Sequence, residues 1–99
     1  MVAKRENLTL FVREGESLKA GVVPRYVVRD LLRDRLGEDE IARIHRFIKP
    51  VESSTVFQAG SVVVDFSKKQ AECFDARIDV KYLEPTWDVK INNVTLANY

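Results

Sequence analysis

The stretch Ser61–Ile78, SVVVDFSKKQAECFDARI, decides the predicted fold of this chain. It consists of an apolar run, a polar break at Ser67–Gln70 and a second run of residues that favour strands. Two extended segments joined by so short a break are expected to pair antiparallel. We therefore place this hairpin in the middle of a small sheet that the rest of the chain must cover.

The register of the hairpin depends on the length of its loop. In the second strand, apolar residues alternate with polar ones from Phe74 to Tyr82. A loop of two or four residues places Val64 beside Cys73, whereas a loop of three places Val62 beside Phe74 and joins the two apolar faces. Because register follows the buried face, we predict the loop of three.

Composition indicates one globular domain spanning residues 1–99. The chain is 45% hydrophobic and 31% charged, which separates it from disordered proteins. Its formal net charge of +1 gives no general attraction to nucleic acid or an anionic membrane. With Cys73 and His45 as the single residues of their types, we expect no internal disulfide, no thiolate zinc site and no cofactor.

No stretch has the pattern of a targeting or membrane segment. Charged and polar residues, Lys4 to Asn7, interrupt the N-terminal apolar residues, so a signal peptide is not expected. No apolar run approaches the length of about 18 residues that a membrane span needs. We therefore predict a cytoplasmic protein with no membrane partner.

The segments before the hairpin predict a strand, a loop and two helices. Alternating apolar residues from Leu8 to Val12 indicate a strand, and the stretch 13–21, REGESLKAG, reads as a loop. A first helix is predicted from Pro24 to Leu36, with Gly37 as its left-handed stop. A second helix opens with the acidic run 38–40 and ends before Pro50. With Gly37 as almost the whole connection, the two helices are expected to form an αα-hairpin.

After the hairpin, Glu84 and Pro85 break the strand pattern, and an alternating segment from Trp87 to Leu96 predicts a late strand. Asn92 and Asn93 within it indicate either a tight turn or a bulge. The predicted fold is α+β: an N-terminal strand, an αα-hairpin and an antiparallel β-meander of three to four strands, with the helices on one face.

Basic residues on the first predicted helix form one candidate site. Arg25, Arg29 and Arg33 fall four residues apart, a spacing that allows contact with successive phosphates. Asp30 and Asp34 lie on the neighbouring flank, so a solvated, salt-bridged face is the favoured interpretation.

Arg35 lies near the centre of the apolar arc of the same predicted helix. Either its long stem passes the last turn to reach solvent, or its guanidinium pairs with Asp39 or with an acid of another copy.

The remaining polar residues give no recognisable catalytic or metal pattern. His45 lies in an apolar helical stripe, where a hydrogen-bonded, partly buried imidazole is the default. Asp75 and Asp79 share a strand face about 13 Å apart, which is too far for a shared metal or an acid–base pair. A site built on Asp65, Asp75 and His45 ranks third among the functional hypotheses, and we assign no catalytic or metal residue.

For function, the sequence favours a non-catalytic module that assembles with itself or with another protein. A sheet edge and the aromatic residues Tyr82 and Trp87 are the expected contacts, with Arg35 as a further one. The alternative is a nucleic-acid-binding accessory protein that uses Arg25, Arg29 and Arg33.

Overall fold

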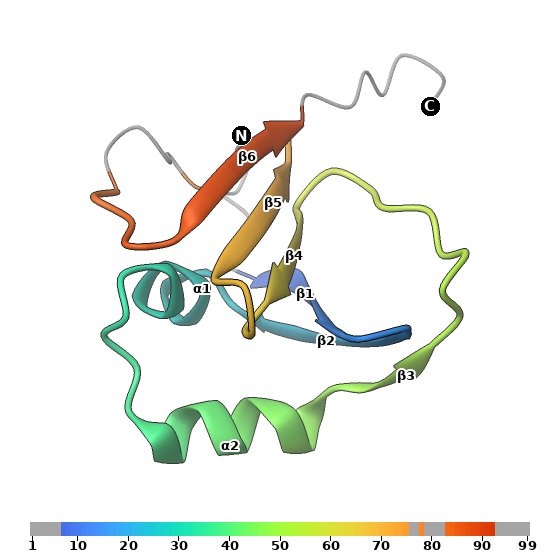
Figure 1. The fold of residues 1–99 in the computed structure, drawn as a ribbon, viewed down its shortest axis with the longest axis horizontal. Helices are drawn as coiled ribbons and strands as arrows, with labels where there is room; N and C mark the ends of the chain where they lie inside the picture. The colour runs from blue at the N-terminus through green and yellow to red at the C-terminus, as the bar shows by residue number, and fades with distance from the viewer. Residues whose placement is uncertain (1–6, 76–77, 79–82, 93–99) are drawn as a thin grey trace, which may run out of the picture.

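The computed structural model describes residues 7–75, 78 and 83–92. Within them, six strands and two helices follow one another in the order β1, β2, α1, α2, β3, β4, β5 and β6 (Figure 1). Their bounds are β1 Asn7–Glu14, β2 Ser17–Pro24, α1 Arg25–Leu32, α2 Glu38–Phe47, β3 Lys49–Val51, β4 Ser61–Asp65, β5 Gln70–Phe74 and β6 Asp88–Asn92. Neither helix is long and apolar enough to cross a membrane, among the residues described.

All six strands belong to one mixed sheet with the order β3-β2-β1-β4-β5-β6. The pairs β1–β2, β2–β3 and β4–β5 are antiparallel, whereas β1–β4 and β5–β6 are parallel. The prediction of an antiparallel meander of three to four strands is therefore wrong. Val62, Val63 and Val64 explain the difference, because an apolar strand buried on both faces belongs in the interior of a sheet, where β4 has a partner on each side.

One face of the sheet, here called the first face, carries the larger core. Leu10 of β1, Val64 of β4 and Cys73 of β5 point to it and are at most 2% exposed. Val28, Leu31 and Leu32 of α1 pack against these strands, and Trp87 closes the core from the segment before β6.

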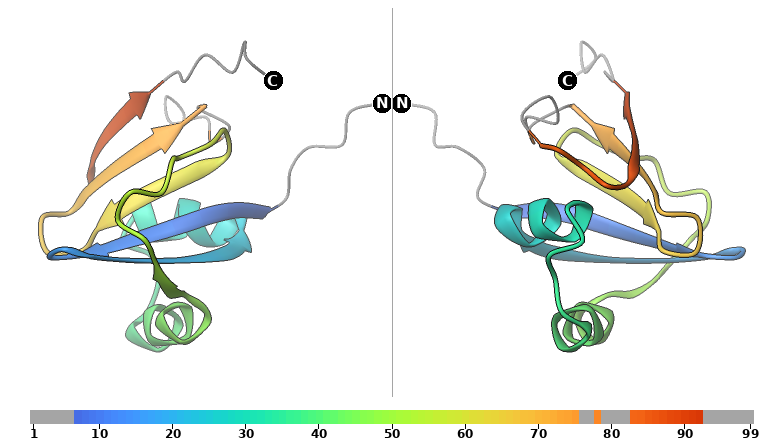
Figure 2. Two further views of the ribbon diagram at one scale, coloured as in Figure 1. Left: turned by 90° about the vertical axis from the view of Figure 1, so that its right-hand side faces the viewer. Right: turned by 60° about the vertical axis from the view of Figure 1, so that its left-hand side comes forward.

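The second face carries a smaller core that the sequence did not predict. Phe57 reaches it from the segment between β3 and β4, which crosses the sheet in Figure 2. Its ring meets Phe11 edge to face at 4.9 Å between centroids and stacks on Phe74 at 5.0 Å. Val63 lies in the same cluster, so β4 is buried from both sides.

The antiparallel hairpin of β4 and β5 is confirmed, but its predicted register is wrong. Residues 66–69 form the loop, and Val62 lies opposite Cys73 rather than Phe74. The loop is fixed by Asp65, whose Oδ1 accepts hydrogen bonds from the Ser67 hydroxyl and backbone N–H at 2.6 and 3.0 Å. A loop of three residues was predicted because it joins the apolar faces of the two strands. Both faces of β4 are apolar, however, so burial alone does not select the register.

The predicted loop at residues 13–21 is also wrong, because most of it is strand β2. Glu14 pairs with Ser17 across a turn in which Gly15 adopts a φ of 62°. Glycine takes this conformation without steric cost. The polar turn is short, and the apolar pattern of β2 is sparse: only Leu18 and Val23 are buried in it.

The two helices do not form the predicted αα-hairpin. α1 ends at Leu32 rather than Leu36, and Gly37 is the N-cap of α2 with a φ of −73° rather than a left-handed stop. The predicted acidic opening of α2 is confirmed.

The helices also do not cover one face together. α1 packs on the first face, whereas α2 lies beyond β2, on the side away from β4, β5 and β6 (Figures 1 and 2). α2 reaches the core through Ile44 and Ile48. Gly21 of β2 permits this contact, because a Cβ there would stand 3.0 Å from Ile48 Cγ2.

The predicted continuation of the hairpin strand to Tyr82 falls largely outside the described residues. β5 ends at Phe74, and Asp75 follows with a φ of 69°. The late strand is present as β6, and it runs parallel to β5 rather than antiparallel. The part of that prediction beyond Asn92 is outside the description.

Candidate functional site

An apolar groove lies between α1 and α2, and we call it the helix groove. Its volume is about 570 Å³. α1 forms one wall with Tyr26, Val27 and Asp30, and α2 forms the other with Glu40, Arg43, Ile44 and Phe47. The end of β2 (residues 22–24) and the connection between the helices (residues 35 and 36) complete the lining.

Three large apolar side chains at the groove are exposed. Val22, Tyr26 and Phe47 are 67%, 58% and 65% accessible to solvent. A single exposed apolar residue is ordinary on a protein surface, but several around one concave site are typical of an interaction surface. The groove is therefore a candidate binding surface.

The end of α1 places Arg35 and Leu36 in this lining. Asp34 adopts a φ of 54°, and the backbone N–H groups of Asp34 and Arg35 donate to the carbonyls of Leu31 and Asp30 at 3.1 and 2.8 Å. This pattern of bonds is the Schellman motif, which terminates a helix and reverses the chain. Arg35 therefore leaves the helix and does not occupy the apolar arc predicted for it.

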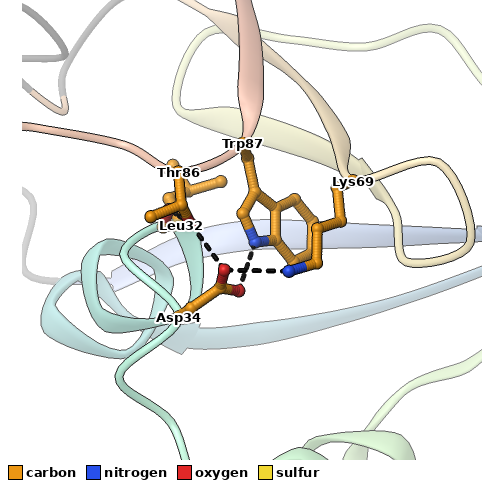
Figure 3. Close-up of polar contacts among 5 residues, drawn as sticks. All are labelled: Leu32, Asp34, Lys69, Thr86 and Trp87. Carbon is orange, nitrogen blue, oxygen red and sulfur yellow. Dashed lines mark hydrogen bonds and ion pairs between the residues drawn. The ribbon is translucent and has the colours of Figure 1, made fainter.

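Asp34 is held in the left-handed conformation by side chains from distant segments (Figure 3). The indole Nε1 of Trp87 donates to Oδ1 at 2.6 Å, and the Thr86 hydroxyl donates to Oδ2 at 2.6 Å. Lys69 Nζ adds an ion pair to Oδ2 at 3.0 Å. We call these four residues the Asp34 cluster. It ties the end of α1 to the β4–β5 loop and to the segment before β6.

These contacts also stabilise the charged form of the carboxylate. Hydrogen bonds from Thr86, Trp87 and Lys69, in decreasing order of effect, lower the pKa of Asp34 to about 2. Its oxygens already accept three donors, so the cluster is a structural tie and not an acid or base for chemistry.

The acidic and basic side chains of the helix groove differ in their surroundings. Asp30 lies 3.8 Å from Arg29 Nε, and Glu40 folds toward Gly37 at the start of α2, where the helix dipole favours an anion. Arg35 and Arg43 are exposed, and no ion pair or hydrogen bond of their side chains is found among the described residues. The groove thus offers two guanidinium groups to a ligand.

The three residues predicted for protein contact do not lie together on one surface. Arg35 lines the groove. Trp87 is only 6% exposed, and its N–H is bonded to Asp34, so it lies in the core and not on a surface. Tyr82 lies outside the described residues.

Of the three arginines predicted as a nucleic-acid site, Arg25 and Arg29 lie on α1 and Arg33 is its C-cap, and they differ in exposure. Arg29 is exposed and lies near Asp30, whereas Arg25 and Arg33 are half-buried at the two ends of the helix.

The remaining candidate residues have structural surroundings. His45 Nδ1 lies 3.4 Å from Glu14 Oε1, and its ring lies 5.3 Å from that of Phe66. Cys73 is buried, and burial raises the pKa of its thiol to about 11. Asp65 is engaged by the β4–β5 loop. Within the described ranges, no group of three or more His, Cys, Asp or Glu residues is arranged to hold a metal ion.

Sequence reasoning missed Val22, Tyr26 and Phe47 as candidate site residues. Phe47 follows Ile44 by three residues, so the stripe of α2 predicts it to be buried. The sequence did hold a signal: each of these large apolar residues lies near an end of its element, which is β2, α1 or α2. The turns that flank the end of an element leave fewer residues to cover such a side chain.

Comparisons with known proteins do not assign this chain to a family. A scan against protein-family models, a search of curated proteins and a search of solved structures each found no match to this chain.

Proposed function

We propose that this protein is a non-catalytic interaction module whose helix groove binds an acidic, amphipathic segment of a partner protein. The observation that carries the proposal is the groove itself, with Val22, Tyr26 and Phe47 exposed around it. Two helices that flank an apolar groove form the usual receptor for the apolar side of a helical ligand.

The size of the groove supports a few anchoring side chains. Its volume of about 570 Å³ accommodates two or three large apolar groups but not a whole helix. Tyr26 and Phe47 resemble the aromatic residues that carry much of the binding free energy at interfaces. The ligand would therefore insert side chains spaced along one face and leave its backbone outside.

The charge of the partner follows from Arg35 and Arg43. Asp30 pairs with Arg29, and Glu40 lies in the first turn of α2, where the helix dipole favours an anion. The side chains of Arg35 and Arg43 line the groove without an ion pair or hydrogen bond among the described residues. Carboxylates that flank the apolar side chains of a ligand would pair with them, and arginine suits such bidentate pairing.

A designed peptide tests this proposal. The probe is a labelled helical peptide with leucines at i, i+3, i+4 and i+7 and with glutamates flanking them, compared with the same peptide carrying lysines instead. We expect the acidic peptide to bind about tenfold more tightly than the basic one by fluorescence anisotropy. The double variant Arg35→Ala/Arg43→Ala should remove this preference, and Phe47→Ala should weaken both peptides.

Arg46→Ala is the matched control, because Arg46 is an exposed arginine of α2 outside the groove. It should leave the affinity and the preference unchanged. The proposal is wrong if neither peptide binds at millimolar concentration, or if the basic peptide binds equally well.

A further inference from the structure

β6 is an edge strand of the sheet. Its partner β5 lies on one side, and no strand pairs with its other side in the described part of the chain. Such an edge presents unpaired backbone groups that can bind another strand. This surface is distinct from the helix groove.

The hydrogen bonds to β5 show which backbone groups of β6 face outward. The Asp88 N–H donates to the Lys69 carbonyl at 3.0 Å, and the Asn92 carbonyl accepts from the Asp75 N–H at 3.1 Å. Because the inward and outward orientations alternate along a strand, Asp88, Lys90 and Asn92 are directed to β5. The N–H and C=O groups of Val89 and Ile91 therefore point away from the sheet.

The side chains of β6 divide into a charged row and an apolar row. Asp88 and Lys90 are exposed and belong to the second face. Val89 packs partly against the core of the first face, and Ile91 on the same side remains 43% exposed. An added strand with the same pattern would continue both rows.

We infer that β6 pairs antiparallel with β6 of a second copy of this chain, in the register that places Val89 opposite Val89 of the second copy. This register joins the outward backbone groups of both strands as a hydrogen-bonded pair. It also places Asp88 opposite Lys90 of the second copy, and the twofold symmetry repeats this ion pair.

Neighbouring registers lack this complementarity. A shift that centres the pair on Lys90 places two lysines directly opposite, which is destabilising. A shift that centres it on Ile91 leaves Asp88 without a lysine across the interface. In the inferred register Ile91 lies opposite Trp87 of the second copy, and the apolar row of the first face continues across the junction. Lysine on an edge usually prevents such pairing, and here it selects one register.

A charge exchange tests the inference. One five-residue strand pair buries less surface than a standard interface, so we expect a weak dimer that sedimentation equilibrium detects at high micromolar concentration. Lys90→Asp replaces two attractions by two repulsions and should weaken dimerisation at least tenfold. Asp88→Lys alone should do the same, and the double variant Asp88→Lys/Lys90→Asp should restore the dimer.

Two further variants separate this contact from general effects. Val89→Pro removes an outward N–H that β5 does not use, and it should abolish the dimer while thermal melting confirms folding. Lys68→Asp changes the charge of an exposed lysine in the β4–β5 loop and should leave the dimer unchanged. A wild-type protein that stays monomeric at millimolar concentration, or a double variant that fails to recover, would overturn the inference. Either result leaves the peptide test of the helix groove standing.

Discussion

Phe57 is the residue on which the second core depends, and its removal gives a measurable cost. The ring is half-buried and makes two aromatic contacts, with Phe11 and Phe74. Truncation of a fully buried Phe costs about 3–5 kcal/mol, and an aromatic pair contributes about 0.5–1.5 kcal/mol. For a half-buried ring with two such pairs, we expect Phe57→Ala to lower the free energy of unfolding by about 2 kcal/mol.

A change of about 2 kcal/mol corresponds to a fall in Tm of roughly 8–16 °C for a domain of this size. Urea unfolding followed by the fluorescence of Trp87, the single tryptophan, measures the free energy directly. Val56→Ala is the matched control, because Val56 precedes Phe57 and is 80% exposed. If both variants unfold at the same urea concentration, Phe57 does not pack on the sheet and the second core is refuted.

Three further predictions concern the Asp34 cluster, the close packing of Gly21 against Ile48, and the buried thiol of Cys73. Because the folded state lowers the pKa of Asp34 from 3.8 to about 2, its contribution to stability is complete above pH 3.8 and is lost as the pH falls toward 2. Urea unfolding should therefore show that the difference between wild type and Asp34→Asn shrinks over that range, and a constant difference would contradict this assignment. Gly21→Ala should destabilise by about 1–3 kcal/mol in the same assay, since the new methyl would lie 3.0 Å from Ile48 and 3.1 Å from the Phe47 carbonyl. Cys73, buried and with its pKa raised to about 11, should resist alkylation at pH 8 in the native protein and react at once in urea, whereas equal rates would show that it is accessible.

Local sequence patterns predicted the elements better than their arrangement. The strand of Leu8–Val12, the β4–β5 hairpin and the acidic opening of α2 depend on neighbouring residues, and all are present. The sheet order depends on which strand β4 meets after a long connection. Its valines indicate burial on both faces but carry no information on whether the neighbour is β1 or another strand.

The end of α1 shows why local rules failed at the candidate site. Gly37 is the residue that propensity selects as a helix stop, and the helical pattern continues to Leu36. The helix instead ends at Leu32, two residues before the left-handed Asp34, because Trp87 and Thr86 bond to the Asp34 carboxylate from 53 and 52 residues away. Asp is tolerated in the left-handed conformation. The tertiary contacts of its carboxylate favour a helix end here over the end at Gly37 that the local sequence predicts.

This contact links the two surfaces proposed for binding. The Asp34 cluster fixes Trp87, which directly precedes β6, and it also fixes the turn that brings Arg35 into the helix groove. Loss of the carboxylate would therefore loosen the start of the edge strand and the basic wall of the groove together. A protein that uses both surfaces needs them to be held in place at once, and one side chain meets that need because its oxygens accept donors from two separate segments, the β4–β5 loop and the segment before β6.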